Sequence, residues 1–325
     1  MKRRIWWTLA VLLLVACGAW YFGQGALTPV TRGDKVYRDA LGREVHLTVP
    51  AERIVTLTGA DSEILLAIGA TPAGTAEHFG VKQDTTGKYA AIPKVGSASA
   101  PNLEQIIALK PDVVIGSAMP FQSVLAPSLE TAGIPALFWQ SERYGVILAH
   151  IRTLGEISGH TREAEEVAAS IERKVAVLQE RYRDRPRLKV LMISGVVGNY
   201  YAATSETLVG NIVGCLPIDN VADRWQMSAH QSGMVTGYVP LDLEYISQLD
   251  VDVIVVITMG SDGREDSETF VRSFADQPAW RHLRAVKEGR IRHLPGELFL
   301  PNPGVRVADS LEATAKVIYD EPADG

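Results

Sequence analysis

Cysteine is scarce in this sequence, and the spacings of the common catalytic and metal-binding motifs are missing. The two cysteines, Cys17 and Cys215, are too few for a disulfide framework or a zinc site, and Cys215 is expected to be a buried apolar thiol. The sequence has no GxxxxGK(S/T), HExxH, CxxC or GxSxG segment, and no GxGxxG at a strand–helix turn. Nothing in it therefore supports a nucleotide site, a metalloprotease or a redox dithiol. The seven histidines show no metal-ligand spacing either.

Positive charge is also in short supply. The chain has 32 Lys and Arg residues against 38 Asp and Glu residues, a formal net charge of −6. This balance argues against a general nucleic-acid binder, because phosphate binding needs a basic face. A content of 46% apolar and 22% charged residues is that of a globular protein and excludes a disordered or collagen-like chain. At about 100–200 residues per domain, the length predicts two domains.

The first residues have the pattern of an export signal. Three basic residues at 2–4 precede an apolar run, and Leu14-Val15-Ala16-Cys17 resembles a bacterial lipobox. That resemblance implies a signal peptide at 1–16, cleavage before Cys17 and a lipid on this cysteine. Cleavage would remove three positive charges and change the formal net charge from −6 to −9. The alternative is an uncleaved membrane helix at 5–22. Either segment leaves the rest of the chain outside the cytoplasm.

Short apolar runs alternate with helical patterns along the remaining chain. After a tether at 17–34, the segment 35–49 alternates around Gly42 and predicts a hairpin. Strands are expected at 53–57, 93–95, 112–116, 135–139, 188–193, 252–257 and 290–294. Helices are expected at 62–68, 103–109, 125–132, 206–213, 243–249, 270–274 and 307–318. Continuous apolar strands that alternate with helices predict an α/β fold with parallel sheets.

One segment of the first half recurs in the second half. Residues 102–115 align without gaps on residues 242–255, and six of the 14 positions are identical. Among the identical pairs are Glu104 and Glu244, and Asp112 and Asp252. Part of this match is expected for any helix–loop–strand segment. Its recurrence in corresponding places predicts two similar lobes.

A long amphipathic segment lies between the two copies. From Thr161 to Arg183, apolar residues recur at spacings of three and four, which predicts a helix of about 23 residues and about 35 Å. It is long enough to link two lobes; the alternative is an ordinary helix of one lobe. The predicted architecture has two Rossmann-like α/β lobes with parallel-rich sheets, joined by a single long α-helix. The N-terminal lobe is expected at 35–158, the linking helix at 159–185 and the C-terminal lobe at 186–325.

The chain resembles the substrate-binding proteins of ABC importers, in the class that serves iron-siderophore, haem and cobalamin uptake. The resemblance is carried by the segments 53–57, 63–69, 95–115, 201–210 and 280–291. It implies a lipid-anchored protein on the outer face of the cytoplasmic membrane, without catalytic activity or a cofactor of its own. Such a protein captures an iron complex, haem or a ferric siderophore, between its lobes. It delivers the complex to an ABC permease dimer with its ATPase.

The same resemblance implies a docking role for one glutamate of each lobe. In this class these glutamates pair with arginines of the permease, and the matching positions are Glu104 and Glu244. Each follows a helix-capping residue, Asn102 or Asp242, and is expected in the first turn of its helix. The alternative is that both carboxylates only interact favourably with the helix dipole.

Ligands of doubly wound sheets bind at the carboxyl ends of the strands. The loops expected there contain aromatic residues, methionines and few charges, which suits a large flat or bulky ligand. The candidate ligand-binding residues are Tyr200, Tyr201, Met259, His230, Trp225, Met227, Met119, Ser99 and His78.

Residues 190–204 most resemble the haem-binding lipoproteins of Gram-positive bacteria. Those proteins commonly use an axial methionine from the first lobe and an axial histidine from the second. Here Ser99 stands near the position of the methionine and Met259 near that of the histidine, so that pair does not carry over. The candidate iron ligands are Met259, Tyr201 and His230. A ferric siderophore or a corrinoid is the alternative ligand, and a sensor module or an extracytoplasmic hydrolase is the alternative function.

Overall fold

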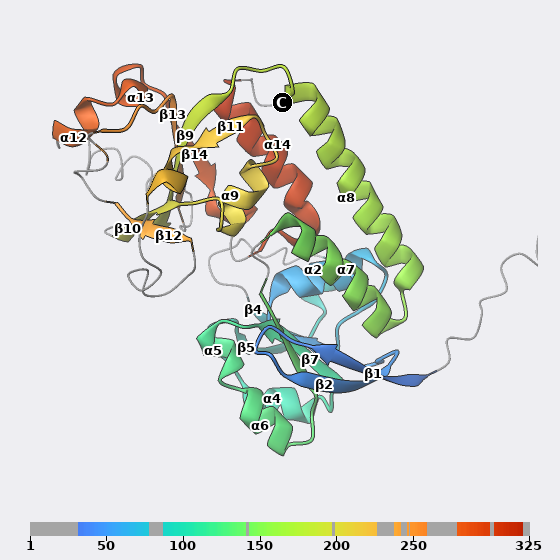
Figure 1. Ribbon diagram of the computed structural model, residues 1–325. Helices are drawn as coiled ribbons and strands as arrows, with labels where there is room; N and C mark the ends of the chain where they lie inside the picture. The colour runs from blue at the N-terminus through green and yellow to red at the C-terminus, as the bar shows by residue number, and fades with distance from the viewer. Residues whose placement is uncertain are drawn as a thin grey trace, which may run out of the picture. The chain divides into compact units, whose positions relative to one another are not determined.

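The computed structural model describes residues 32–77, 87–140, 143–196, 199–225, 237–241, 246, 248–258, 278–299 and 302–320. The chain divides into two compact units, Met1–Gly33 and Asp34–Gly325. Figure 1 traces the larger unit, which holds two separate six-stranded sheets and a two-stranded hairpin. The candidate lipidation site, Cys17, lies outside the described residues.

The predicted hairpin is confirmed. Its strands, β1 (Gly33–Arg38) and β2 (Glu44–Val49), pair with each other. On β2, buried side chains alternate with exposed ones, as expected for a strand with one face on the core. Glu156, on a later helix, binds β1 by accepting a hydrogen bond from Tyr37 Oη at 3.0 Å and by an ion pair with Lys35. The Lys35 contact lowers the pKa of Glu156.

The first sheet is parallel except at one edge. Its strand order is β6-β5-β4-β3-β7-β8, and only β6 runs antiparallel to its neighbour. The strands are β3 (Ile54–Thr56), β4 (Gly74–Glu77), β5 (Lys94–Ser97), β6 (Ala100–Pro101), β7 (Val113–Ser117) and β8 (Ala136–Trp139). Their helices are α2 (Gly59–Ala67), α3 (Gly87–Ala90), α4 (Leu103–Ala108), α5 (Pro120–Ser123) and α6 (Ala126–Thr131).

The second sheet has a parallel centre and an antiparallel edge. Its order is β12-β10-β9-β13-β14, and β11 pairs in parallel with the first half of β9. The strands are β9 (Leu188–Val196), β10 (Asn199–Ala203), β11 (Ile218–Asn220), β12 (Tyr238–Pro240), β13 (Val253–Thr258) and β14 (Ile291–Pro295). The associated helices are α9 (Leu208–Val213), α12 (Pro278–Arg281), α13 (Arg284–Lys287) and α14 (Val307–Ile318), with 3-10 turns η1 (Val221–Arg224), η2 (Gly296–Leu298) and η3 (Gly304–Arg306).

The sequence repeat has a structural counterpart at the base of each sheet. Asp112 accepts a hydrogen bond from the Arg53 amide at 2.9 Å, and its own amide donates to Arg53 O at 2.9 Å. Asp252 makes the same pair of bonds with Lys189, both at 2.8 Å. Each aspartate directly precedes a strand, β7 or β13, and holds the beginning of that strand against the start of the neighbouring strand, β3 or β9. This shared arrangement makes β3 equivalent to β9 and β7 equivalent to β13.

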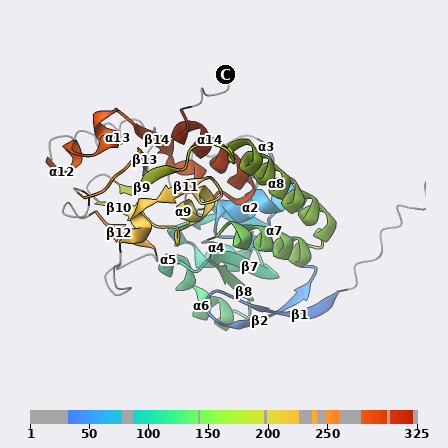
Figure 2. The ribbon, with the colours of Figure 1, turned by 45° about the horizontal axis from the view of Figure 1, so that its top comes forward.

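Three helices share one hydrophobic core with both sheets. They are α7 (Tyr144–Ser158), the 22-residue α8 (Thr161–Tyr182) and α14. Figures 1 and 2 both show α8 beside α7 and α14. A single cluster of buried residues joins Ile54 of β3, Ile171 of α8 and Val255 of β13. The opposite faces of the two sheets have clusters of their own. Burial of each aliphatic side chain there contributes about 1.5–3 kcal/mol.

The α/β fold class with parallel-rich sheets is confirmed. All strands of the first six-stranded sheet precede α8 in the sequence, and all strands of the second follow it. The lobe boundaries and the role of α8 as the single link stay predictions. The expected helix at 270–274 and most of that at 243–249 lie outside the described residues. Cys215 is half-buried rather than fully buried, and burial raises the pKa of its thiol.

Candidate functional site

The parallel strands of the first sheet end along one edge, and the loops after them carry the candidate site. Leu57 and Thr58 follow β3, Ala98 and Ser99 follow β5, and Met119 follows β7 by two residues. Ser99 is exposed, and Met119 is 39% exposed. Phe121 on α5 is 43% exposed beside Met119. Met119 and Phe121 give this edge of the sheet exposed apolar surface, Ser99 adds a hydroxyl, and Glu77, the exposed last residue of β4, adds a carboxylate.

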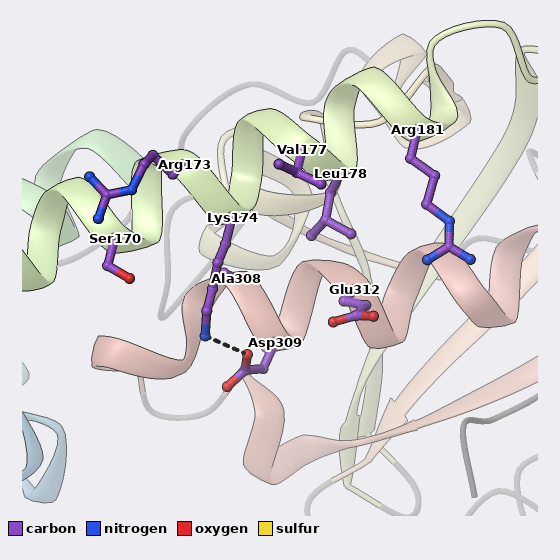
Figure 3. A pocket seen from close by; sticks show the side chains of 9 residues that line it. All are labelled: Ser170, Arg173, Lys174, Val177, Leu178, Arg181, Ala308, Asp309 and Glu312. Atoms are coloured by element: carbon purple, nitrogen blue, oxygen red, sulfur yellow. Dashed lines mark ion pairs between the residues drawn. The ribbon is translucent and has the colours of Figure 1, made fainter.

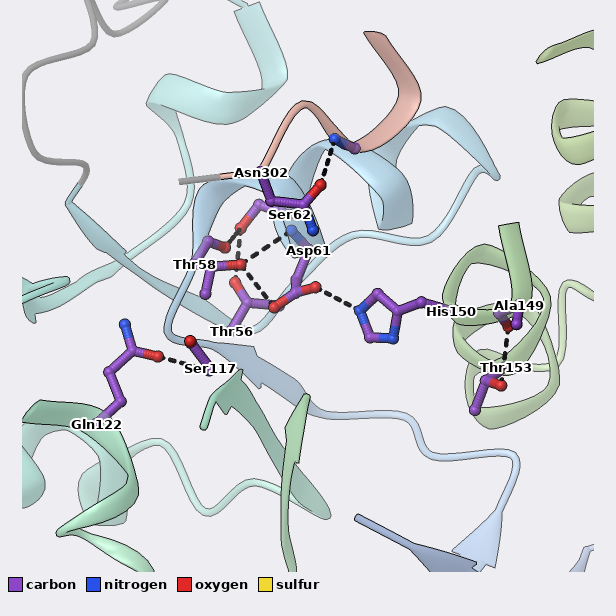
Figure 4. A network of polar contacts seen from close by, with 11 residues as sticks. Thr56, Thr58, Asp61, Ser62, Ser117, Gln122, Ala149, His150, Thr153 and Asn302 are labelled. Atoms are coloured by element: carbon purple, nitrogen blue, oxygen red, sulfur yellow. Dashed lines mark hydrogen bonds and ion pairs between the residues drawn. The ribbon is translucent and has the colours of Figure 1, made fainter. Parts of the chain in front are cut away.

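A buried amide joins three of these loops. The side chain of Gln122, 1% exposed, accepts a hydrogen bond from Ser117 N at 2.7 Å and donates to Leu57 O at 2.8 Å and Ala98 O at 2.9 Å. Figure 4 shows Gln122 reaching Ser117 from the helix that follows β7. The end of β7 and the backbones that follow β3 and β5 are therefore bound to one side chain.

Hydroxyl groups line the start of α2 at the same edge. Thr58 caps the helix by accepting a hydrogen bond from the Asp61 amide at 3.2 Å, as threonine commonly does. The Ser62 hydroxyl lies 2.6 Å from that of Thr56 and 2.8 Å from that of Thr75. These bonds satisfy polar groups that the core would otherwise leave unpaired.

A buried acid–base pair connects the start of α2 to α7. His150 Nε2 lies 2.6 Å from Asp61 Oδ1, and the two side chains are 2% and 6% exposed. The second carboxylate oxygen accepts from Thr58 Oγ1 at 2.6 Å. The His150 ring also packs on Trp139, with centroids 4.8 Å apart. Figure 4 shows His150 pointing from its helix at Asp61. The pair fixes where α2 begins, and so positions the loop after β3.

In the second sheet, Tyr200 and Tyr201 lie on β10 and face opposite ways. Tyr200 is half-buried against the cluster on one face of the sheet. Tyr201 is 37% exposed and pairs in register with Ser194 and Pro240. Nearby, burial raises the pKa of Tyr238, while a hydrogen bond with Ser194 opposes that change. Of the two adjacent tyrosines, Tyr201 has the side chain that is open to a ligand.

Trp225, a candidate ligand contact, directly follows the turn η1. Its side chain is only 8% exposed and packs in the same cluster as Tyr200. This burial favours a packing role over ligand contact. The other expected residues of the site lie outside the described residues: His78, Met227, His230 and Met259. The structure therefore brings Ser99 and Met119 to one edge of the first sheet and leaves Tyr201 on the second.

Glu104 has the position expected for a surface contact. It is exposed in the first turn of α4, after Asn102, whose side chain accepts from the Gln105 amide at 3.0 Å. Its partner in the repeat, Glu244, lies outside the described residues.

A groove of about 390 Å³ lies between α8 and α14, away from the strand ends. Figure 3 shows it lined by Arg173, Lys174 and Val177 of α8 and by Asp309 and Glu312 of α14. Lys174 Nζ is 3.7 Å from Asp309 Oδ1. No lining residue comes from a loop after a strand, so this groove is not part of the candidate site.

Two features are absent from the described ranges. No helix there combines the length and apolar character needed to cross a bilayer. Nor do His, Cys, Asp and Glu side chains within those ranges gather in a group of three or more suited to a metal ion.

The arrangement of this chain was compared with known proteins. A family model described as periplasmic binding protein matches residues 54–298. The chain belongs to this family. The match covers both six-stranded sheets and the helices α7 and α8, and it ends before α14. It confirms the class of binding protein that the sequence resembles.

Among curated relatives, the "Probable siderophore-binding lipoprotein YfiY" of Bacillus subtilis is 22% identical over 310 residues, or 93% of each chain. The "Fe(3+)-citrate-binding protein YfmC" of the same organism is 23% identical over 319 residues, covering 96% of this chain and 95% of that protein.

Solved structures share the fold at low identity. Staphylococcus aureus IsdE complexed with heme has a TM-score of 0.69 at 20% identity, with 82% of this chain and 98% of that chain covered. Staphylococcus aureus SirA complexed with staphyloferrin B has a TM-score of 0.68 at 20% identity, with 88% and 98% covered.

Proposed function

We propose that this chain is the extracytoplasmic substrate-binding protein of an ABC importer for an iron complex, either a ferric siderophore or haem. The observation that carries the proposal is the family match over 54–298, together with near-full-length relatives named for siderophore and ferric citrate binding. The relatives are named as binding proteins, and we assign this chain no catalytic activity. The iron complex is transported cargo, not a cofactor.

The chemistry of the described loops supports a bulky ligand. Met119, Phe121 and Tyr201 expose apolar or aromatic surface at or beside strand ends. Such surface matches the organic part of an iron complex, which provides most or all of the iron's own ligands. Tyr201 is the described candidate for direct contact with iron. In the sequence, Met119 is the second residue after β7, and Met259 directly follows the equivalent strand β13. Each half of the chain therefore offers one methionine just after the equivalent strand.

Delivery and anchoring complete the proposal. We infer that Glu104 and Glu244 dock one lobe each onto the permease dimer, so that the permease contacts both lobes at once. We also propose that Cys17 carries the lipid that holds the protein on the outer face of the cytoplasmic membrane, and that α8 links the lobes at 35–158 and 186–325.

An absorbance and fluorescence titration tests the ligand class. The full-length chain is titrated with hemin, ferric citrate, a ferric catecholate, a ferric hydroxamate and cobalamin. We expect submicromolar binding of one iron complex, weakened at least tenfold by Tyr201→Ala or Met119→Ala. The matched control, Tyr37→Phe on the hairpin, should bind as wild type does. A Soret shift with hemin would assign haem, and tight binding of a siderophore alone would assign that class. Binding of cobalamin alone, or turnover of any probe, would overturn the proposal.

A further inference from the structure

We propose that Gln122 is the positioning residue of the ligand site: one buried carboxamide holds the three loops that present ligand contacts from the first sheet. This inference rests on the proposed function and extends it to a residue that does not itself touch the ligand. Its three hydrogen bonds, to Ser117, Leu57 and Ala98, are 2.7–2.9 Å long. They reach the last residue of β7 and the chain that follows β3 and β5.

The loop after β3 is also joined to β7, because Leu57 N donates to Ile115 O at 2.7 Å. The strands β3 and β5, by contrast, are separated in the sheet by β4, so no pairing between them joins the loops that follow. Gln122 Nε2 donates to both Leu57 O and Ala98 O, so one nitrogen atom holds these two loops together. The next residue after Ala98 is Ser99, a candidate ligand contact.

The fold makes room for this amide. Gly116 on β7 carries no side chain, and a Cβ there would lie 3.1 Å from Gln122 Oε1 and 3.1 Å from Leu57 Cδ1. Gln122 itself is almost fully buried. A buried amide in a space this tight stays in one orientation, because each of its polar atoms has a partner.

The helix that bears Gln122 depends on it. α5 has four residues and no side-chain cap, and a helix this short is not stable by its own hydrogen bonds. It nevertheless presents the exposed side chains of Met119 and Phe121. The bonds of Gln122 therefore tie the short helix beside these two side chains to the backbone after β3 and β5.

The chemistry of the cluster selects glutamine. The site needs one acceptor, for Ser117 N, and two donors, for the carbonyls of Leu57 and Ala98. A carboxamide supplies this set on one group. A carboxylate supplies acceptors only and would face two carbonyl oxygens. A protonated carboxyl supplies one of the two donors.

The test compares Gln122→Met and Gln122→Glu with Gln105→Met and Gln105→Glu, since Gln105 is exposed on α4. Hemin, ferric citrate, a ferric catecholate and a ferric hydroxamate are the probes, and backbone hydrogen exchange is followed in the full-length chain. In Gln122→Met we expect about tenfold faster exchange at Ser117–Met119 and Ala98–Ser99, with Val114 and Ile115 in the strand unchanged. Affinity for the probe that wild type binds should fall at least tenfold.

The Gln122→Glu variant provides a signature that a packing role lacks. Its affinity relative to wild type should recover as the pH falls and the introduced carboxyl gains a proton, whereas Gln122→Met should show no such recovery. Affinities within twofold of wild type, or faster exchange spread evenly over the whole sheet, would overturn the proposal. If wild type binds none of the probes, the proposed function fails, while the exchange pattern still decides whether Gln122 holds the loops.

Discussion

Loss of the Asp61–His150 pair should destabilise the chain strongly, because both side chains are buried. The substitution His150→Phe keeps a ring beside Trp139 but removes the nitrogen 2.6 Å from Asp61 Oδ1. Asp61 would then retain only the hydrogen bond from Thr58 Oγ1. Removing one partner of such a buried pair costs about 3–5 kcal/mol.

This cost should appear as a lower melting temperature. For a domain of more than 150 residues, 1 kcal/mol corresponds to about 2–4 °C, so we expect a loss of roughly 6–20 °C by calorimetry. Asp61→Asn retains a hydrogen-bonding group and should cost about 1–2 kcal/mol. In the double variant Asp61→Asn with His150→Phe, no carboxylate is left unpaired, so its cost should be smaller than the sum of the single costs.

The matched control is His46→Phe, because His46 is exposed on β2. It should change the free energy of unfolding by less than about 0.5 kcal/mol. If His150→Phe also costs less than about 1 kcal/mol, the pair does not fix the start of α2, and the reasoning about this loop is wrong.

Three further predictions concern docking, packing and pH. The double substitution Glu104→Ala with Glu244→Ala should leave ligand affinity unchanged and abolish uptake in cells, and normal uptake would refute the docking assignment. Gly155→Ala would place a Cβ 2.2 Å from Ala164 Cβ, between α7 and α8; we expect about 1–3 kcal/mol of destabilisation in denaturant titrations, despite the better helix propensity of alanine. The ion pair with Lys35 lowers the pKa of Glu156 below the ordinary glutamate value of 4.5. The ion pair therefore stabilises the fold fully at a pH above 4.5, and this stabilisation is lost as the pH falls through the lowered pKa. Because Glu156 is partly exposed, Glu156→Gln should cost under about 1 kcal/mol at pH 7 and progressively less as the pH falls through the lowered pKa of Glu156. A cost that does not shrink at acidic pH would contradict the assignment.

The architecture could be predicted where the signal is local. Apolar spacing located α8 to within one residue of its end, and the match of 102–115 to 242–255 predicted two similar halves. The bonds of Asp112 and Asp252 explain why that match includes both aspartates: each closes the base of a strand pair. Because both positions need the same carboxylate contact, the same residue type, aspartate, occurs at the same place in each copy of the repeat.

The parts of the fold and of the candidate site that could not be predicted depend on contacts between segments that are distant in the sequence. Asp61 and His150 are 89 residues apart, and no spacing in the sequence links them. Met119 was expected at the site, but the buried amide of Gln122 beside it shows only once the ends of β3, β5 and β7 are brought together. Trp225 was expected to contact the ligand, whereas tertiary packing buries its ring. The α7 helix was not predicted, although its buried residues, such as Ile147 and Ile151, do recur at helical spacing.

The amount of iron that the purified chain retains tests the central claim most directly. The full-length chain is mixed separately with a ferric siderophore, ferric citrate, hemin and a simple ferric salt, and is then separated from small molecules by size-exclusion chromatography. We predict that about one iron per chain is retained from at least one of the complexes and none from the simple salt. Equal retention from the salt, or no retained iron from any complex, would contradict the account.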